Sequence, residues 1–194
     1  RIRMIIRRSE RDLEANPLTR LPGNISITNE LQNHIDKKTL FAVGYLDLDK
    51  FKAYNDKYGF EHGDEAIRET ARIMLSAVNE HGNSDDFVGH IGGDDFVFIT
   101  TLDKAEEISQ KIIEEFEKKV PSLYTPEDAK NGWIMAHDRK GQLQKVNLLS
   151  VSIGIVTNEF RAITHPAQIG EIGAELKEAA KRLERSNYIK DQRK

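Results

Sequence analysis

The sequence predicts an α+β fold of the ferredoxin-like palm type, with helices flanking a central, mostly antiparallel sheet. Three observations predict this architecture. The nearly all-apolar run 40–48 is typical of a central strand that is covered on both faces. Two strand-like runs, 87–91 and 96–101, enclose a Gly-Gly-Asp-Asp turn and form a hairpin. Amphipathic helical patterns occupy three further segments, namely 63–80, 104–120 and 165–185.

The first segment, Arg1 to Ala15, is predicted to be a helix with isoleucines on one side and arginines on the other. It is either a frayed basic helix or the end of a coiled stalk that transmits a signal from an upstream domain, because so short a segment cannot establish heptads. We therefore expect a linker at 1–15 and a single domain at 16–194. Since the chain starts with Arg1 rather than methionine, we expect it to be a domain of a longer protein.

A connector and a helix follow this linker. Two prolines and Gly23 make 16–24 rich in turns, because these residues oppose helix formation. Asn24 or Ser26 is then expected to cap a helix that runs to about Ile35.

The elements after the central strand follow from similar signals. A short helix is predicted at 51–57. The segment 121–145 is expected to be irregular, with a turn at 138–141. A strand at 146–156 precedes the last helix, and 188–189 is expected to form a closing edge strand.

Composition limits the classes of function. The 194 residues fit one domain, and 38% hydrophobic with 31% charged residues is ordinary for a soluble protein. A net charge of -3 gives no overall basic field, so we expect no nucleic-acid partner. The absence of cysteine excludes disulfides and thiolate metal sites, and it fits a reducing cytoplasm. No apolar run approaches the roughly 20 residues that cross a bilayer, so we expect no membrane insertion.

Acidic residues stand at the end of the central strand and in the hairpin. Asp47 and Asp49 share one face if the strand persists, because side chains alternate along a strand. Asp49 could instead cap the helix that starts near Phe51. Asp94 and Asp95 would face opposite ways on an ideal strand, so one could join Asp47 at a metal while the other reaches a second substrate. Carboxylates on adjacent strand ends suit a divalent cation that holds a nucleotide triphosphate.

Glycine and amide groups lie close to these carboxylates in the sequence. Gly92 and Gly93 can supply the positive φ of a tight turn and let a ligand approach the backbone, although Gly-Gly-Asp-Asp is also a common turn sequence. Asn55 and Asp64 combine donors and acceptors that match the edge of a guanine. The same residues are consistent with a helix that stops at Gly59 and with an N-cap of the next helix.

The last predicted helix carries basic residues, Lys181, Arg182 and Arg185, on the side away from its leucines. A solvated basic face is the ordinary explanation. A triphosphate, however, needs cations beyond the metal, and these side chains could supply them.

Several separated motifs resemble, in the right order, those of the GGDEF family, the diguanylate cyclases. The resemblance covers about Asn16 to Asp191. The motifs are Asn-Pro-Leu-Thr-Arg-Leu at 16–21, Asp-Leu-Asp-Lys-Phe-Lys at 47–52, Asn55-Asp56-x-x-Gly59, Gly63-Asp64, the signature Gly-Gly-Asp-Asp-Phe at 92–96, and Ser-Ile-Gly-Ile at 152–155.

The resemblance implies a palm of the nucleotide cyclase type that works as a homodimer. Each half-site would hold one GTP and two Mg²⁺ or Mn²⁺ ions, and two transfer steps would give cyclic di-GMP and pyrophosphate. The metal would be held by Asp47, by the Leu48 carbonyl and by the acidic signature residues Asp94 and Asp95. Asp94 or Asp95 would also deprotonate or orient the attacking 3′-hydroxyl. The expected substrate-binding residues are Phe51, Lys52, Asn55, Asp64, Gly92, Gly93, Lys181 and Arg185, with Asn55 and Asp64 at guanine and Lys181 and Arg185 at phosphate.

The chain departs from the family pattern at several positions. Asp95 replaces Glu and is one methylene shorter, which could weaken or abolish turnover because metal–ligand distances tolerate little error. Asn83 replaces the Arg of the product-inhibition motif, so we expect no inhibitory site. His90 replaces an Arg whose acidic partner in the connector is here Asn16, and a neutral pair could compensate for the ionic one. Phe60 stands at a position that is commonly His.

Three functions therefore compete. The first is a diguanylate cyclase, the cytoplasmic output module of a bacterial signalling protein with an upstream sensory or regulatory domain. The second is a catalytically degenerate domain that binds GTP and regulates a neighbouring domain. The third is a related cyclase that uses ATP or makes mixed products, but Asp64 argues against it because an acidic side chain favours the N–H donors of guanine. We expect the first.

Overall fold

The computed structural model describes residues 14–137 and 141–193. Five strands form the main sheet: β1 (Ala42–Asp49), β2 (Phe87–Gly92), β3 (Asp95–Thr100), β6 (Ser150–Thr157) and β7 (Asn187–Lys190). The larger helices are α2 (Asn24–Asp36), α3 (Phe51–Tyr58), α4 (Phe60–His81), α5 (Ala105–Lys119) and α7 (Pro166–Lys181). A smaller unit between α5 and β6 consists of the 3-10 helix η1 (Val120–Leu123), α6 (Pro126–Asn131), β4 (Trp133–His137) and β5 (Leu143–Asn147).

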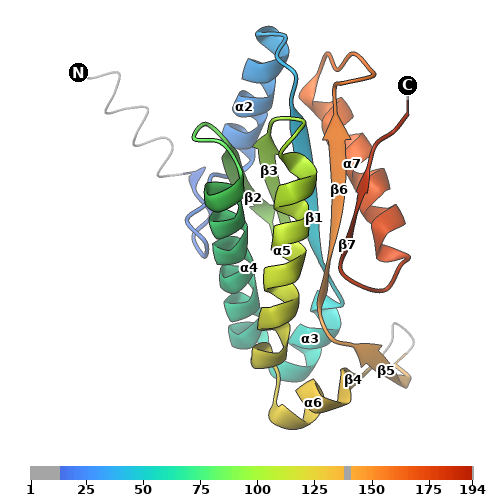
Figure 1. The fold of residues 1–194 in the computed structure, drawn as a ribbon. Coiled ribbons are helices and arrows are strands. Elements are labelled where there is room, and N and C mark those ends of the chain that lie inside the picture. Colours follow the sequence, from blue (N-terminus) through green and yellow to red (C-terminus); the bar gives the residue numbers. More distant parts are fainter. Residues whose placement is uncertain (1–13, 138–140, 194) are drawn as a thin grey trace, which may run out of the picture.

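The strand order in the main sheet is β2-β3-β1-β6-β7, so that β1 lies at its centre (Figure 1). All neighbouring strands are antiparallel except β6 and β7, which are parallel. The predicted α+β palm with a mostly antiparallel sheet is therefore confirmed, as is the closing edge strand, which is β7.

Two helical layers cover the two faces of the sheet, and the alternation of side chains along β1 assigns its residues to them. Leu46 and Leu48 join the core formed with α4 and α5. Val43 and Tyr45 point to the other face and pack with residues of α2 and α7. Because Asp47 continues the series of Val43 and Tyr45, its side chain lies on the α7 face. The alternation along β1 therefore determines that α7, rather than α4 or α5, lies beside the Asp47 carboxylate.

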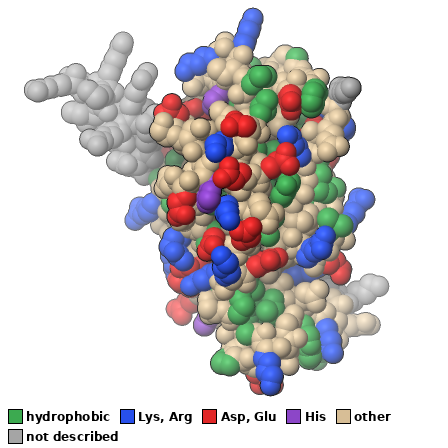
Figure 2. Space-filling model, viewed as in Figure 1, with side chains coloured by type: hydrophobic (Ala, Val, Ile, Leu, Met, Phe, Trp, Pro, Cys, Tyr) green, Lys and Arg blue, Asp and Glu red, His purple; other side chains and the backbone are tan. Residues whose placement is uncertain are grey.

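The face formed by α4 and α5 carries acidic and basic side chains that are interspersed rather than gathered by sign (Figure 2). Some of them form ion pairs one helical turn apart, such as Arg72 with Glu69 at 2.7 Å. Over 14–137 and 141–193, no helix has both the length and the apolar character that crossing a membrane requires.

The prediction that 121–145 is irregular was wrong. The segment contains α6 and the hairpin of β4 and β5, and the turn predicted inside it falls mostly outside the described residues. These elements are short, and they are held by contacts with residues that lie far from them in the sequence. Local sequence patterns do not report such contacts. The Tyr54 hydroxyl of α3 donates to the Leu123 carbonyl at 2.8 Å, and Tyr58 of α3 donates to the Asp128 carboxylate.

Two caps that the sequence suggested are also wrong. The helix α4 begins at Phe60, directly after Gly59, so Asp64 lies inside the helix and does not cap it. The N-cap of α3 is Lys50 with φ of 66°, and no side chain caps this helix, so Asp49 is free for another role.

The limits of α2 and α7 differ from the predictions as well. Neither Asn24 nor Ser26 caps α2; the Glu14 carboxylate accepts hydrogen bonds from the amides of Ile25 at 2.6 Å and Ser26 at 3.0 Å. The helix α7 ends at Lys181 rather than at position 185. Apart from residues 14 and 15, the helix predicted at 1–15 lies outside the described residues.

Candidate active site

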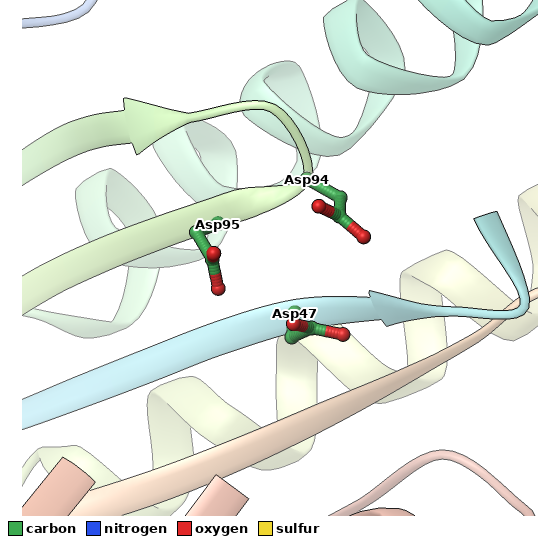
Figure 3. A group of neighbouring side chains, drawn as sticks. All are labelled: Asp47, Asp94 and Asp95. Atoms are coloured by element: carbon green, nitrogen blue, oxygen red, sulfur yellow. The ribbon is translucent and has the colours of Figure 1, made fainter. Parts of the chain in front are cut away.

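Three carboxylates meet where β1 passes the hairpin turn between β2 and β3 (Figure 3). One oxygen from each of Asp47, Asp94 and Asp95 lies within 4.8 Å of the others. The register explains this proximity, because Asp47 pairs with Asp95 between β1 and β3, and the Leu48 amide donates to the Asp94 carbonyl at 3.3 Å. Asp47 is 5% exposed, whereas the other two are half-buried. Carboxylate oxygens are the ligands that hard divalent cations prefer, so this cluster can hold a cation.

The hairpin turn brings both of its aspartates to the same side. Gly92 and Gly93 have φ of 148° and 58°, values that other residues rarely adopt. The pairing of β2 with β3 also shifts its register between His90 and Gly92. The expectation that Asp94 and Asp95 face opposite ways is therefore wrong, because the turn does not keep the alternation of an ideal strand.

Two lysines of α7 bind the carboxylate cluster. Lys177 Nζ lies 3.0 Å from Asp47 Oδ1 and also pairs with Asp95 Oδ1. Lys181 Nζ lies 2.9 Å from Asp47 Oδ2. The sequence indicated Lys181 but missed Lys177, although the two are one helical turn apart and therefore share a face.

The charges in this cluster change one another's pKa. Burial opposes the charge of Lys177, but its hydrogen bond with Asp95 and the attraction of Asp47 outweigh burial, so the pKa of the ammonium is raised. A similar balance, with Asp47 as the main partner, raises the pKa of Lys181. Burial and the negative charge of Asp47 raise the pKa of Asp94. Both lysines therefore stay charged at neutral pH.

Two glycines explain how α7 comes so close to β1. A Cβ on Gly173 would lie 2.5 Å from Tyr45 Cδ2, and one on Gly154 would lie 2.8 Å from the Gly173 carbonyl oxygen. Ordinary contacts of a Cβ begin at 3.4 Å. Without these glycines α7 could not lie directly on β1 and β6, and Lys177 would stand farther from Asp47.

Asp49 has a structural role at the end of β1. Its Oδ2 accepts hydrogen bonds from the hydroxyls of Ser150 and Ser152, both at 2.8 Å. Burial raises the pKa of Asp49, and the two hydroxyls partly oppose this rise. Asp49 therefore ties the end of β1 to β6 and fixes the position of Asp47 and Leu48.

A second polar site forms where α3 meets α4. Asn55 Oδ1 is buried and has no hydrogen-bond partner in the described part of the chain. A Cβ on Gly63 would lie 2.9 Å from Asn55 Cγ and nearer still to Oδ1, so the glycine leaves the room that the carboxamide fills. Asp64, the next residue, is exposed. A buried free acceptor beside an exposed carboxylate matches the N–H donors of a guanine edge.

The remaining predicted residues are divided between site and surface. Phe51 and Lys52 lie in the first turn of α3, ahead of its first helical hydrogen bond, which joins Tyr54 to Lys50 at 3.1 Å. Their amides are therefore free for an anion. Arg185 lies exposed beyond α7, and no ion pair among the described residues joins it to the three carboxylates.

A comparison with known protein families shows which family has this sequence pattern. The family model described as diguanylate cyclase, GGDEF domain, matches residues 15–186. The chain belongs to the GGDEF family.

Curated relatives share this domain over part of their length. The signaling protein YkoW of Bacillus subtilis is 35% identical over 82 residues, which are 40% of this chain and 10% of YkoW. The probable diguanylate cyclase DgcT of Escherichia coli is 31% identical over 108 residues, which are 53% of this chain and 23% of DgcT. The chain thus spans less than a quarter of the length of these two relatives.

A solved structure has the same fold. The diguanylate cyclase SiaD of Pseudomonas aeruginosa, in complex with its activator SiaC, superposes with a TM-score of 0.71 at 19% identity. The match covers 98% of this chain and 66% of SiaD.

In this GGDEF domain His90 does not pair with Asn16, contrary to expectation. Its Nδ1 lies 2.9 Å from Thr19 Oγ1, and its Nε2 lies 3.0 Å from the Gly93 carbonyl. Because a carbonyl only accepts, Nε2 carries the proton and Nδ1 accepts from the Thr19 hydroxyl. Burial lowers the pKa of His90, which keeps the ring neutral. Asn16 Oδ1 accepts instead from two amides of its own turn.

In this GGDEF domain, the residues at the position of the product-inhibition motif, Asn83 and Asp86, form hydrogen bonds with each other and with neighbouring residues of the chain. Asn83 Nδ2 donates to Thr101 Oγ1 at 3.0 Å and to Asp86 Oδ1 at 3.3 Å. Asp86 Oδ2 also accepts from the Asn83 amide at 2.8 Å and from the Thr100 hydroxyl at 2.6 Å. Both residues therefore stabilise the turn between α4 and β2.

Proposed function

We propose that this GGDEF domain is a diguanylate cyclase, which condenses two molecules of GTP into cyclic di-GMP and releases pyrophosphate. The observation that carries the proposal is the convergence of Asp47, Asp94 and Asp95 within 4.8 Å at an open hairpin turn. Membership of the GGDEF family supports the choice of substrate. We further propose that two copies of the domain act together as a homodimer. In the whole protein, which we place in the cytoplasm, an upstream sensory or regulatory domain would control it.

Asn55 and Asp64 would select guanine. The buried Asn55 Oδ1 lacks a donor, and the N1–H or the exocyclic amino group of guanine would supply one. The carboxylate of Asp64 would accept from a second N–H of the same edge. Adenine has no N1–H, so it would leave the Asn55 oxygen unpaired at a cost of about 1–3 kcal/mol.

The carboxylate cluster fits a hard divalent cation such as Mg²⁺ or Mn²⁺, because all of its candidate ligands are oxygens. Asp47, Asp94 and Asp95 would hold the metal together with the Leu48 carbonyl. Such a metal, when bound, neutralises the triphosphate and polarises its α-phosphorus.

The protein's own groups would position the substrate. The amides of Phe51 and Lys52 at the start of α3 would hold the phosphates, together with the Lys181 ammonium that pairs here with Asp47. A Cβ on Gly92 or Gly93 would meet nothing within 4 Å, which leaves open space at the turn for a ligand. Asp94 or Asp95 would orient or deprotonate the 3′-hydroxyl that attacks the GTP of the partner protomer.

A second function is favoured by a specific observation. Asp95 is shorter than the glutamate of the family signature, and its carboxylate is paired with Lys177. A domain that binds GTP without turning it over, and that regulates a neighbouring domain, is compatible with this pairing.

One assay separates the two functions. The dimeric protein is incubated with GTP and Mg²⁺, and cyclic di-GMP and pyrophosphate are quantified. The cyclase function predicts two pyrophosphates for each cyclic di-GMP, and Asp47→Asn should abolish both products and metal-dependent GTP binding. Tight GTP binding without product would favour the regulatory function. Failure of the native protein to bind GTP would refute both.

A further inference from the structure

Lys177 occupies a position that would otherwise suit a cation bridging two carboxylates. Its Nζ lies 3.0 Å from Asp47 Oδ1 and pairs at the same time with Asp95 Oδ1. The Lys177 side chain is 14% exposed, so the ammonium is held inside the cluster and does not lie over it from solvent. Lys181 differs in both respects, because it pairs with Asp47 alone among the three carboxylates and is 32% exposed.

The packing of α7 holds Lys177 in this position. Its amide nitrogen would lie 3.0 Å from a Cβ on Gly154, so the backbone of the lysine rests directly on β6. One turn earlier in α7, Gly173 rests on the ring of Tyr45 in β1 with no room for a methyl group. The base of the Lys177 side chain therefore has a fixed place above the strands that carry Asp47.

An ammonium and a divalent cation cannot share this position. Both need the same oxygens of Asp47 and Asp95, and two cations at contact distance repel each other strongly. Other oxygens stay available, because no lysine pairs with Asp94 among the described ion pairs and only one oxygen of Asp95 is taken. Asp47 Oδ2 is paired with Lys181, and it would become available when Lys181 turns to the phosphates of GTP. The cluster thus has room for a metal ion beside the ammonium, but not for a second ion between Asp47 and Asp95.

We propose that the Lys177 ammonium replaces one of the two metal ions implied by the family resemblance, so that each protomer holds its GTP with a single divalent cation. This inference rests on the proposed GTP site and deepens it. Lys177 supplies a permanent positive charge where the family relies on a bound metal, and it fixes the orientation of Asp47 and Asp95 before substrate arrives.

Counting bound Mn²⁺ tests the inference without relying on turnover. Free Mn²⁺ is measured by electron paramagnetic resonance in titrations of the native protein and of Lys177→Met, first alone and then with α,β-methylene GTP. Without nucleotide, Lys177→Met should bind Mn²⁺ about tenfold or more tightly than the native protein, because a competing positive charge is gone. With nucleotide, the native protein should hold one Mn²⁺ per protomer and Lys177→Met two.

Two control variants test whether the Mn²⁺ count depends on a positive charge at position 177 rather than on the net charge of the protein. Lys177→Arg keeps a cation at the cluster and should retain the native count. Lys111→Met makes the same change in net charge at an exposed pair with Glu114 on α5, and it should behave as the native protein does. Mn²⁺ should also raise the melting temperature of Lys177→Met more than that of the native protein. The melting curve shows in one measurement that the variant is folded and that it binds the metal ion.

Two Mn²⁺ ions on the nucleotide-bound native protein would overturn the proposal, and this result does not depend on any variant folding. A count of one in Lys177→Met, or equal Mn²⁺ affinities without nucleotide, would overturn it too. Absence of nucleotide binding to the native protein would instead refute the proposed GTP site. The nucleotide-free comparison would then still decide whether Lys177 excludes a metal ion.

Discussion

Replacing Gly63 with alanine should weaken the selection of guanine while leaving the fold intact. The new Cβ would lie 2.9 Å from Asn55 Cγ, about half an ångström inside the 3.4 Å at which ordinary contact begins, and nearer still to Oδ1. Because Gly63 lies within a helix, the side chain of Asn55 must turn away. A lost hydrogen bond to guanine costs about 1–3 kcal/mol, which corresponds to roughly 5- to 150-fold weaker GTP binding.

Calorimetric titration with GTP and with ATP, whose adenine lacks both the N1–H and the 2-amino group of guanine, measures this effect. The native protein should prefer GTP, and Gly63→Ala should lose most of that preference. Gly170→Ala is the matched control, because its Cβ would meet only the Tyr45 hydroxyl at 3.9 Å, an ordinary contact on α7. The control should bind GTP normally and gain about 0.5–1 kcal/mol of stability. An unchanged preference in Gly63→Ala would refute the role of Asn55.

Three further predictions concern the signature hairpin and its surroundings. The free energy of unfolding should fall as the pH drops below about 6.5, by up to about 1.4 kcal/mol per pH unit, because burial lowers the pKa of His90 and the unfolded chain then binds the extra proton. Urea titrations on both sides of that pH should show this slope in the native protein and not in His90→Gln; equal slopes would contradict it. Asp95→Glu should raise turnover about tenfold by lengthening the reach of the carboxylate, and a pyrophosphate assay that finds an equal or lower rate would exclude side-chain length as the limit. Added cyclic di-GMP should leave initial rates unchanged, since Asn83 and Asp86 are engaged in a local turn; noncompetitive inhibition would disprove this.

The sequence predicts those parts of the fold that depend on local patterns. The apolar run of β1 and the two glycines of the hairpin are such patterns, and the antiparallel register then brings Asp47 opposite Asp95. The hairpin β4–β5 and the pairing of His90 with Thr19 depend on contacts between distant segments, so no local pattern reports them.

Lys177 illustrates the same limit within the candidate site. Its spacing from Lys181 predicts a shared helix face, but not the distance of that face from the sheet. That distance depends on Gly154 in β6 and Gly173 in α7, where each glycine removes a methyl group from a contact between two elements. The role of a charged residue can therefore depend on a small residue such as Gly154 in a neighbouring strand, which no pattern within its own helix reports.

The most direct test of the proposed site is a crystal structure of the protein with Mn²⁺ and α,β-methylene GTP, in which anomalous scattering locates the metal. We expect an Mn²⁺ peak bounded by oxygens of Asp47, Asp94 and Asp95, with the guanine against Asn55. A bound nucleotide whose metal lies away from all three carboxylates, or whose base lies away from Asn55, would contradict the account.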